Sequence, residues 1–326
     1  MTLPWTPEDR DWDLEILRRF QRAGFTFVSL TLTDWPPTFE GTLGSIQRFK
    51  DMVSIEASDW LSFATSLANI ERARSEGKLV VGFNSQETLP IGTDLARIET
   101  LHAAGIRHML LAYNVRNFVA DGCAESADAG LSNFGRKVVQ EMNRIGVVVD
   151  CSHTARRSTL EAIELSGRPT IFSHSGAYEV EPHIRNIRDD QIRACAAKGG
   201  VIGIVGIGSF LGDWQAQSES LFRHIDYVAE LVGPEHVGLG TDHVPPATFR
   251  KELARAAYQK YGVKPWPDAE VGWTNPTGTQ LPRGSPCFQP EQLTELVGIM
   301  LAHGYPEGAV KKILGGNFRR VYATVL

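Results

Sequence analysis

Short apolar runs alternate with helix-like segments along most of the chain. The runs predict buried strands at residues 25–33, 79–84, 108–114, 147–153, 169–175, 201–209 and 236–243. The segments between and around them predict helices at 11–23, 93–104, 136–145, 154–166, 189–197, 221–231, 289–303 and 307–314. Alternating strands and helices are typical of a parallel sheet, and near-continuous apolar strands predict a sheet covered on both faces.

Glycine marks the ends of several predicted helices. Gly105, Gly146, Gly167 and Gly233 each follow a helix-like segment directly. Glycine is favoured just past a helix C-terminus because it adopts a left-handed backbone conformation at no steric cost. The ends of these helices, and therefore the starts of the strands that follow, are well defined by the sequence.

The fold class that this pattern predicts is an α/β protein, a (β/α)8 TIM barrel, and the strand-end histidines described below make it one of the metal-dependent hydrolase type. Its length of 326 residues suits a single barrel domain over 1–326. A closed barrel needs eight strands, and only seven are clear. The stretch Leu3-Pro4-Trp5 before the first helix makes a poor strand because proline donates no ladder hydrogen bond. We therefore expect a first strand that is degenerate, supplied otherwise or missing, and the sequence leaves open whether one lies upstream of Met1.

The segment 245–286 does not continue the alternation. It is rich in proline, glycine, tryptophan and threonine, with a helical patch near 251–260. A connection of this length is uncommon in a compact domain unless it has a function. We expect it to be an insertion that covers the rim of the barrel.

Polar residues follow five of the predicted strands at the same end. They are Asn84, Tyr113 with Asn114, Asp150 to His153, His174, and Asp242 with His243. In a β/α barrel the active site is built at the C-terminal ends of the strands. The sequence therefore predicts a site at this rim.

Two histidines at neighbouring strand ends suggest a metal site. They lie in Asp150-Cys151-Ser152-His153 and in Ser173-His174-Ser175, about twenty residues apart. Neutral imidazoles on adjacent strands can bind one divalent ion when their ring nitrogens lie within about 4 Å of each other. This arrangement points to metal-assisted hydrolysis. The alternative is that His153 and His174 are ordinary rim histidines in a site without metal.

Composition argues against nucleic acid and membranes as partners and indicates the cellular compartment. Net charge is −5 with 22% charged residues, which leaves no basic stripe for nucleic acid. Apolar residues make up 42%, but no run approaches the roughly 18 residues of a membrane span. The four cysteines show no CxxC spacing and suit free thiols. We expect a cytoplasmic protein without a leader or membrane anchor.

Eight sets of short strings along the chain form an ordered pattern. They are Gly130-Leu131-Ser132-Asn133-Phe134-Gly135, Glu141-Met142-Asn143-Arg144-Ile145-Gly146, Asp150-Cys151-Ser152-His153, Ser173-His174-Ser175, Arg185-Asn186 with Asp189-Asp190, Gly199-Gly200-Val201-Ile202-Gly203, Gly238-Leu239-Gly240-Thr241-Asp242 and Gly315-Gly316-Asn317-Phe318. Together they resemble the membrane (renal-type) dipeptidase family, zinc peptidases of the amidohydrolase superfamily. The resemblance spans nearly the whole chain and is densest between residues 100 and 205.

The resemblance implies roles for four residues. His153 and His174 match the histidines of the second zinc, and Asp242 matches the aspartate that takes a proton from the nucleophilic water and passes it to the leaving amine. Arg185 matches the arginine that holds the substrate carboxylate, although a surface pair with Asp189 or Asp190 stays open. A homodimer is also implied by the resemblance.

The chain departs from the family at three positions. No His-x-Asp pair stands before Leu3-Pro4-Trp5, Asn84 falls where the family has a bridging glutamate, and Tyr113 falls where it has a substrate-side histidine. Asn84 and Tyr113 are then expected to contact the substrate, and Glu87 is a possible substitute ligand. With fewer ligands we expect one zinc ion per chain, or none.

The resulting functional prediction is a zinc-dependent dipeptidase. Its substrates would be dipeptides or similar small amides with a free carboxylate. An alternative is a degenerate barrel that binds a small carboxylate or peptide-like ligand, with one or no metal and little hydrolysis. A third is a one-metal enzyme acting on another small amide or ester. The substrate side chains and their stereochemistry stay open.

Overall fold

The computed structural model describes residues 10–32, 37–243 and 287–325, with the side chains of residues 10–13 excepted. The strands are β1 (Phe27–Thr31), β2 (Leu61–Phe63), β3 (Leu79–Ser85), β4 (Ile106–Leu110), β5 (Val148–Asp150), β6 (Ile171–Ser175), β7 (Val201–Val205) and β8 (Val237–Gly240). The helices are α1 (Arg10–Arg22), α2 (Phe39–Glu56), α3 (Leu67–Ser75), α4 (Ala96–Ala104), α5 (Asn133–Ile145), α6 (Arg156–Leu165), α7 (Asp189–Ala197), α8 (Gly208–Leu211), α9 (Ser218–Val232), α11 (Leu293–Ala302), α12 (Glu307–Lys311) and α13 (Asn317–Tyr322).

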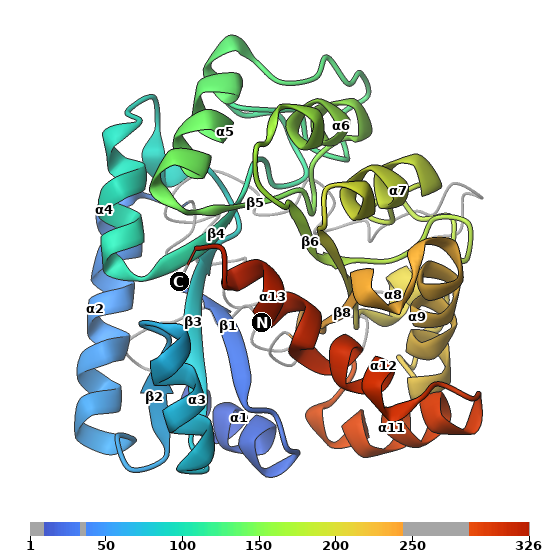
Figure 1. The fold of residues 1–326 in the computed structure, drawn as a ribbon. Coiled ribbons are helices and arrows are strands. Elements are labelled where there is room, and N and C mark those ends of the chain that lie inside the picture. Colours follow the sequence, from blue (N-terminus) through green and yellow to red (C-terminus); the bar gives the residue numbers. More distant parts are fainter. Residues whose placement is uncertain (1–9, 33–36, 244–286, 326) are drawn as a thin grey trace.

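The strands form one parallel sheet that curls into an open barrel (Figure 1). Its order is β1-β3-β4-β5-β6-β7-β8, and β2 pairs with the first residues of β3. Strand β1 pairs along one edge of β3. On the other edge, β2 pairs with the first residues of β3, and β4 pairs with its last residues. Within the described residues β1 and β8 are not paired with each other, so the sheet is not closed there.

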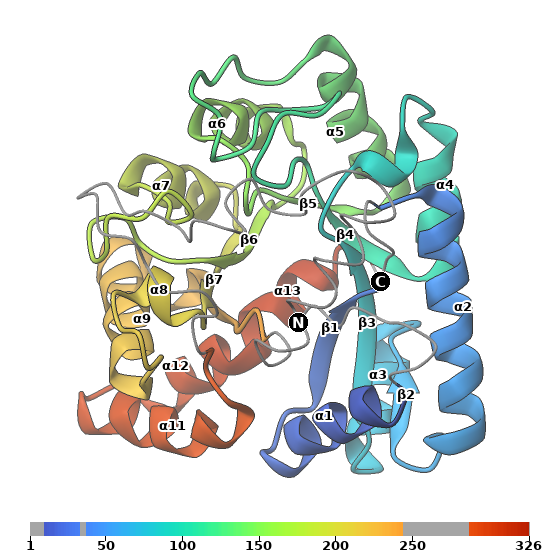
Figure 2. The same cartoon turned by 180° about the vertical axis from the view of Figure 1, so that it is seen from behind.

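Helices surround the strands in an outer layer, as both views show (Figures 1 and 2). Helix α1 bridges the first and last parts of the barrel, because Arg19 Nη2 donates to Glu291 Oε2 at 2.8 Å and to Gln289 Oε1 at 2.9 Å. The outer layer is therefore continuous where the sheet is open. None of the described helices is both long and apolar enough to cross a bilayer.

The C-terminal helix α13 covers the floor of the barrel. Val321 and Tyr322 pack against Val148, Ile171 and Val201, the first residues of β5, β6 and β7. Burial of these side chains removes the N-terminal ends of the strands from water. The C-terminal ends, where the polar residues lie, are left at the opposite rim.

The parallel β/α barrel predicted from the sequence is confirmed, with every one of the seven predicted strands present. Strands β4, β5 and β8 end three or four residues before their predicted ends, and in the segments that follow Asn114, His153 and Asp242 adopt left-handed backbone conformations, with φ of 61°, 62° and 45°. The pattern missed β2, which has only three residues, and the helices α2, α3, α8 and α13. Leu3-Pro4-Trp5 and the insertion at 245–286 lie outside the described residues, and the single domain over 1–326 stays a prediction.

Substitution of Gly240 by alanine should disrupt the contact between β8 and β6. A Cβ atom on Gly240 would lie 1.8 Å from the carbonyl oxygen of Ser173 and 3.0 Å from His174 Cα. Because the obstacle is backbone, a strand must shift, and we expect a loss of about 3 kcal/mol or more in unfolding free energy by urea titration. Gly298→Ala in α11 is the control, since no described atom lies within 4 Å of its Cβ and alanine favours a helix. Equal stability of the two variants would contradict this packing.

Candidate active site

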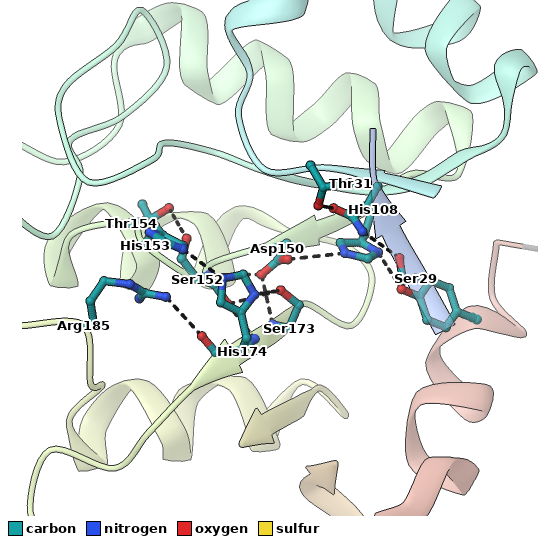
Figure 3. A network of polar contacts seen from close by, with 12 residues as sticks. Ser29, Thr31, His108, Asp150, Ser152, His153, Thr154, Ser173, His174 and Arg185 are labelled. Atoms are coloured by element: carbon teal, nitrogen blue, oxygen red, sulfur yellow. Dashed lines mark hydrogen bonds and ion pairs between the residues drawn. The ribbon is translucent and has the colours of Figure 1, made fainter. Parts of the chain in front are cut away.

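Two histidines face each other at the rim of the barrel. His153 follows β5 and His174 lies in β6, and their Nε2 atoms are 2.8 Å apart (Figure 3). Both side chains are buried, with 6% and 5% exposure. The proximity expected from their positions on adjacent strands is confirmed.

A hydrogen bond sets the orientation of the His153 ring. Its Nδ1 lies 2.7 Å from Asn114 Oδ1, and because an amide oxygen only accepts, Nδ1 carries the hydrogen. The lone pair of His153 is then on Nε2, directed at His174. His174 Nδ1 contacts Ser173 Oγ at 2.7 Å, where the hydroxyl can donate or accept. The ring orientations suit two Nε2 ligands.

Burial keeps both imidazoles neutral. It lowers the pKa of His153 well below its ordinary value, and the Arg185 charge acts in the same direction. It lowers the pKa of His174 to about 4, against the opposing charge of Asp242. Neutral imidazole is the form that binds metal ions.

Asn114 is a site residue whose role the sequence did not reveal. Its Oδ1 accepts from His153 and from the Cys123 thiol, whose Sγ lies 3.5 Å away. Its φ of 61° is tolerated better by asparagine than by most residues. A polar residue at a strand end was the available signal, but its left-handed turn toward His153 is decided by the loop that follows.

Asp150 ties together the two segments that carry the histidines. Its side chain is fully buried, and Oδ1 accepts from the backbone N–H groups of Ser152 at 3.0 Å and Ser173 at 3.1 Å. Its other oxygen, Oδ2, lies 3.7 Å from His108 Nε2. Asp150 therefore positions the histidine segments through their backbone rather than through a ring nitrogen.

A buried polar chain continues from Asp150 to the floor of the barrel (Figure 3). His108 Nδ1 lies 2.5 Å from the hydroxyl of Tyr322 in α13. Burial lowers the pKa of His108 to about 3 and raises that of Asp150, so the 3.7 Å contact is not a full ion pair. The sequence predicted only packing or solvated roles for His108, because its partners lie far away in the chain.

Glu87 holds the loop after β4. Its Oε1 accepts from the backbone of Thr88 at 3.2 Å and from Asn117, and its Oε2 accepts from the backbone of Tyr113 at 3.0 Å. Burial raises the pKa of Glu87 to about 7. The described residues contain no group of three His, Cys, Asp or Glu that could hold a metal, so Glu87 is not a third ligand beside the histidine pair.

Tyr113 and Asn84 lie on the β1 side of the site. The Tyr113 ring stacks on the His153 ring, with centroids 4.0 Å apart and planes at 23°. Asn84 accepts from Thr31 Oγ1 at 2.6 Å and donates to Ser29 Oγ at 2.8 Å. A neutral hydrogen-bonded cluster therefore surrounds the position that the resemblance assigns to a bridging carboxylate.

Arg185 borders a cavity of about 290 Å³ beside the histidine pair, which His153 also lines. Its side chain is 2% exposed, and Nη2 donates to the carbonyl oxygen of His174 at 3.3 Å (Figure 3). Its Nε has no hydrogen-bond partner among the residues described. A buried guanidinium with unused donor capacity next to a cavity is suited to binding an anion.

The alternative of a surface ion pair for Arg185 is wrong. Asp190 pairs instead with Arg156, with Nη2 and Oδ2 2.5 Å apart, and Asp189 accepts from the hydroxyl of Tyr227 at 2.9 Å.

Asp242 follows β8, is half-buried and has a left-handed φ of 45°. Its charge acts to raise the pKa of His174. Of the four described non-glycine residues with positive φ, three thus border this site.

His153 and His174 supply two neutral nitrogens that a single metal ion could share, one fewer than the three protein ligands usual at catalytic zinc. A second ion would need further anionic ligands, and the described residues provide no such cluster. The amide of Asn84 is neutral and already hydrogen-bonded.

A curled parallel sheet with histidines and an aspartate at its C-terminal rim defines a β/α-barrel protein with a candidate site at that rim. The sequence profile of membrane dipeptidase (peptidase family M19) matches residues 25–257. The chain belongs to this family.

Similar proteins agree with this assignment. An uncharacterized dipeptidase, C965.12, of Schizosaccharomyces pombe is 33% identical over 176 residues, which cover 52% of this chain and 42% of that protein. The chain thus spans less than half the length of the curated relatives it matches. An amidohydrolase of Pseudomonas aeruginosa has a TM-score of 0.83 at 25% identity, covering 99% of this chain and 94% of that one. A metallopeptidase of Rhodobacter sphaeroides, bound to a phosphinate mimic of L-Ala-D-Ala, has a TM-score of 0.74 at 20% identity, covering 95% and 90%.

Proposed function

We propose that this chain is a zinc-dependent dipeptidase that acts on dipeptides or similar small amides with a free carboxylate. The observation that carries the proposal is the cavity shared by His153 and the buried Arg185. The cavity brings an anion-binding guanidinium next to His153, one of the two histidines proposed to hold the metal. The solved metallopeptidase with a dipeptide mimic supports a substrate of this class.

Each site residue has a proposed role. His153 and His174 hold one zinc ion, which when bound would polarise the scissile carbonyl and lower the pKa of a water molecule. Asp242 takes a proton from that water and delivers it to the leaving amine. Arg185 binds the substrate carboxylate through a two-pronged hydrogen bond.

Tyr113 and Asn84 complete the proposed substrate contacts. The phenol of Tyr113 donates to the developing oxyanion, and stacking on His153 fixes the ring beside the metal site. Asn84 keeps one N–H and one lone pair beyond its bonds to Ser29 and Thr31. The homodimer and the cytoplasmic location stay predictions.

A second candidate function is binding of a small carboxylate or peptide-like ligand with little hydrolysis. It is favoured by the neutral cluster around Asn84, which replaces a metal-bridging group. It is also favoured by the direct contact of the two Nε2 atoms, which satisfies them without a metal. In that case Arg185 would still bind its anion.

Zinc content and turnover together test the proposal. We expect about one zinc per chain by elemental analysis, lost in His153→Ala and His174→Ala, and hydrolysis within a panel of L,L- and L,D-dipeptides. Each alanine variant is compared with the wild type at equal zinc concentration. Two tightly held ions would contradict the one-metal site. Dipeptide binding by calorimetry without zinc uptake or turnover would refute hydrolysis and support the second candidate.

A further inference from the structure

The cavity beside the histidine pair is lined by three arginines. Arg185 is buried, whereas Arg156 and Arg188 are partly exposed, with side-chain exposures of 57% and 46%. Arg156 is committed to Asp190, with Nε and Nη2 contacts of 2.5 to 3.2 Å. The Nε–Nη2 edge of Arg156 and its positive charge are therefore engaged by a carboxylate of the protein itself.

Arg188 is held in place but is only weakly paired. Its guanidinium lies over the Tyr178 ring at 3.8 Å from the centroid, and its Nη1 is 3.9 Å from Glu179 Oε1. Stacking on an aromatic ring fixes the plane of a guanidinium and leaves its N–H edge available. Arg188 thus has no close carboxylate partner, whereas the charge of Arg156 is paired with Asp190 at 2.5 Å.

The acidic residues of the cavity wall are already engaged. Asp128 accepts from the backbone of Gly130 at 3.2 Å, from Ser158 Oγ at 3.1 Å and from the backbone of Arg157 near the start of α6. Glu125 Oε1 accepts from the backbone of Arg116 at 2.6 Å. The hydrogen-bonding groups that remain for a ligand are therefore mainly the N–H donors of the arginines.

We propose that the cavity selects ligands with two negative groups. This inference rests on the proposed function: the main-chain carboxylate binds Arg185, and an acidic side chain on the same residue binds Arg188. A cavity of about 290 Å³ has room for one acidic residue. The preferred substrates are then dipeptides, or similar small amides, with aspartate or glutamate at the C-terminal position.

The test compares two probes that differ in one charge. N-acetylglutamate and N-acetylglutamine, each as L and D forms, are titrated into the full chain by calorimetry. We expect N-acetylglutamate to bind at least tenfold more tightly than N-acetylglutamine, because its side-chain carboxylate forms a charged hydrogen bond with the Arg188 guanidinium. Arg188→Met should abolish that preference and leave binding of N-acetylglutamine unchanged, and Arg188→Lys should retain part of it.

Arg157→Met is the matched control. Arg157 is in α6 beside Arg156, is 63% exposed, pairs with Glu161 and does not line the cavity. This variant should keep the full preference. Equal binding of the two probes by the wild type, no binding of either, or a preference that survives Arg188→Met would overturn the inference.

Failure of the proposed function gives a different result. If no dipeptide is hydrolysed but N-acetylglutamate is preferred through Arg188, the inference stands and the dipeptidase proposal fails. If dipeptides ending in glutamate and glutamine are hydrolysed with equal kcat/KM, and the probes bind equally, the dipeptidase proposal stands and the inference fails.

Discussion

The Asp242→Asn variant is expected to lose at least about a hundredfold in kcat on any dipeptide that the wild type hydrolyses. General acid–base catalysis contributes roughly a hundred- to ten-thousandfold, and an amide cannot take and return the proton. KM should change little, because Arg185 supplies the carboxylate contact. Asparagine also tolerates the left-handed φ of 45° at this position, so the backbone should be kept.

Steady-state kinetics check this result, and the zinc content of each sample is measured alongside. Thermal unfolding should show the same midpoint for Asp242→Asn and the wild type, which excludes misfolding as the cause. Binding of N-acetylglutamate should also be unchanged. A variant that turns over substrate at the wild-type rate would show that another group moves the proton.

The Asp150→Ala variant is expected to lose about 3 to 5 kcal/mol of unfolding free energy. Removal of the carboxylate leaves the backbone N–H groups of Ser152 and Ser173 buried without an acceptor. It also leaves His108 without its neighbour at 3.7 Å. Because the two histidine segments are no longer tied together, zinc affinity should fall as well.

Asp150→Asn separates the lost hydrogen bonds from the lost charge. Its Oδ1 can still accept from both N–H groups, so we expect a much smaller loss than in Asp150→Ala. Asp59→Ala is the surface control, since Asp59 is 78% exposed and its nearest cation is 3.9 Å away, and it should change stability by less than about 0.5 kcal/mol. Urea unfolding measures all three. An Asp150→Ala loss as small as that of Asp59→Ala would rule out the positioning role.

Much of the site was predictable because neighbouring strands of a parallel barrel present their ends side by side. The apolar runs before His153 and His174 placed both residues at one rim, and the 2.8 Å contact of their Nε2 atoms confirms the proximity. Other contacts carried no local signal. Tyr322 reaches His108 only because α13 covers the barrel floor.

The sequence by itself determined the parallel barrel, the rim that carries the polar residues and the adjacency of the two histidines, because these follow from local periodicity and from the rules of strand order. Only the tertiary structure decided which polar groups remain available. Arg156 is paired with Asp190 whereas Arg188 is stacked and weakly paired, and Asn84 is hydrogen-bonded to two hydroxyls but keeps one N–H and one lone pair. Such differences depend on side chains from separate elements meeting at hydrogen-bond distance, which no local pattern in the chain specifies.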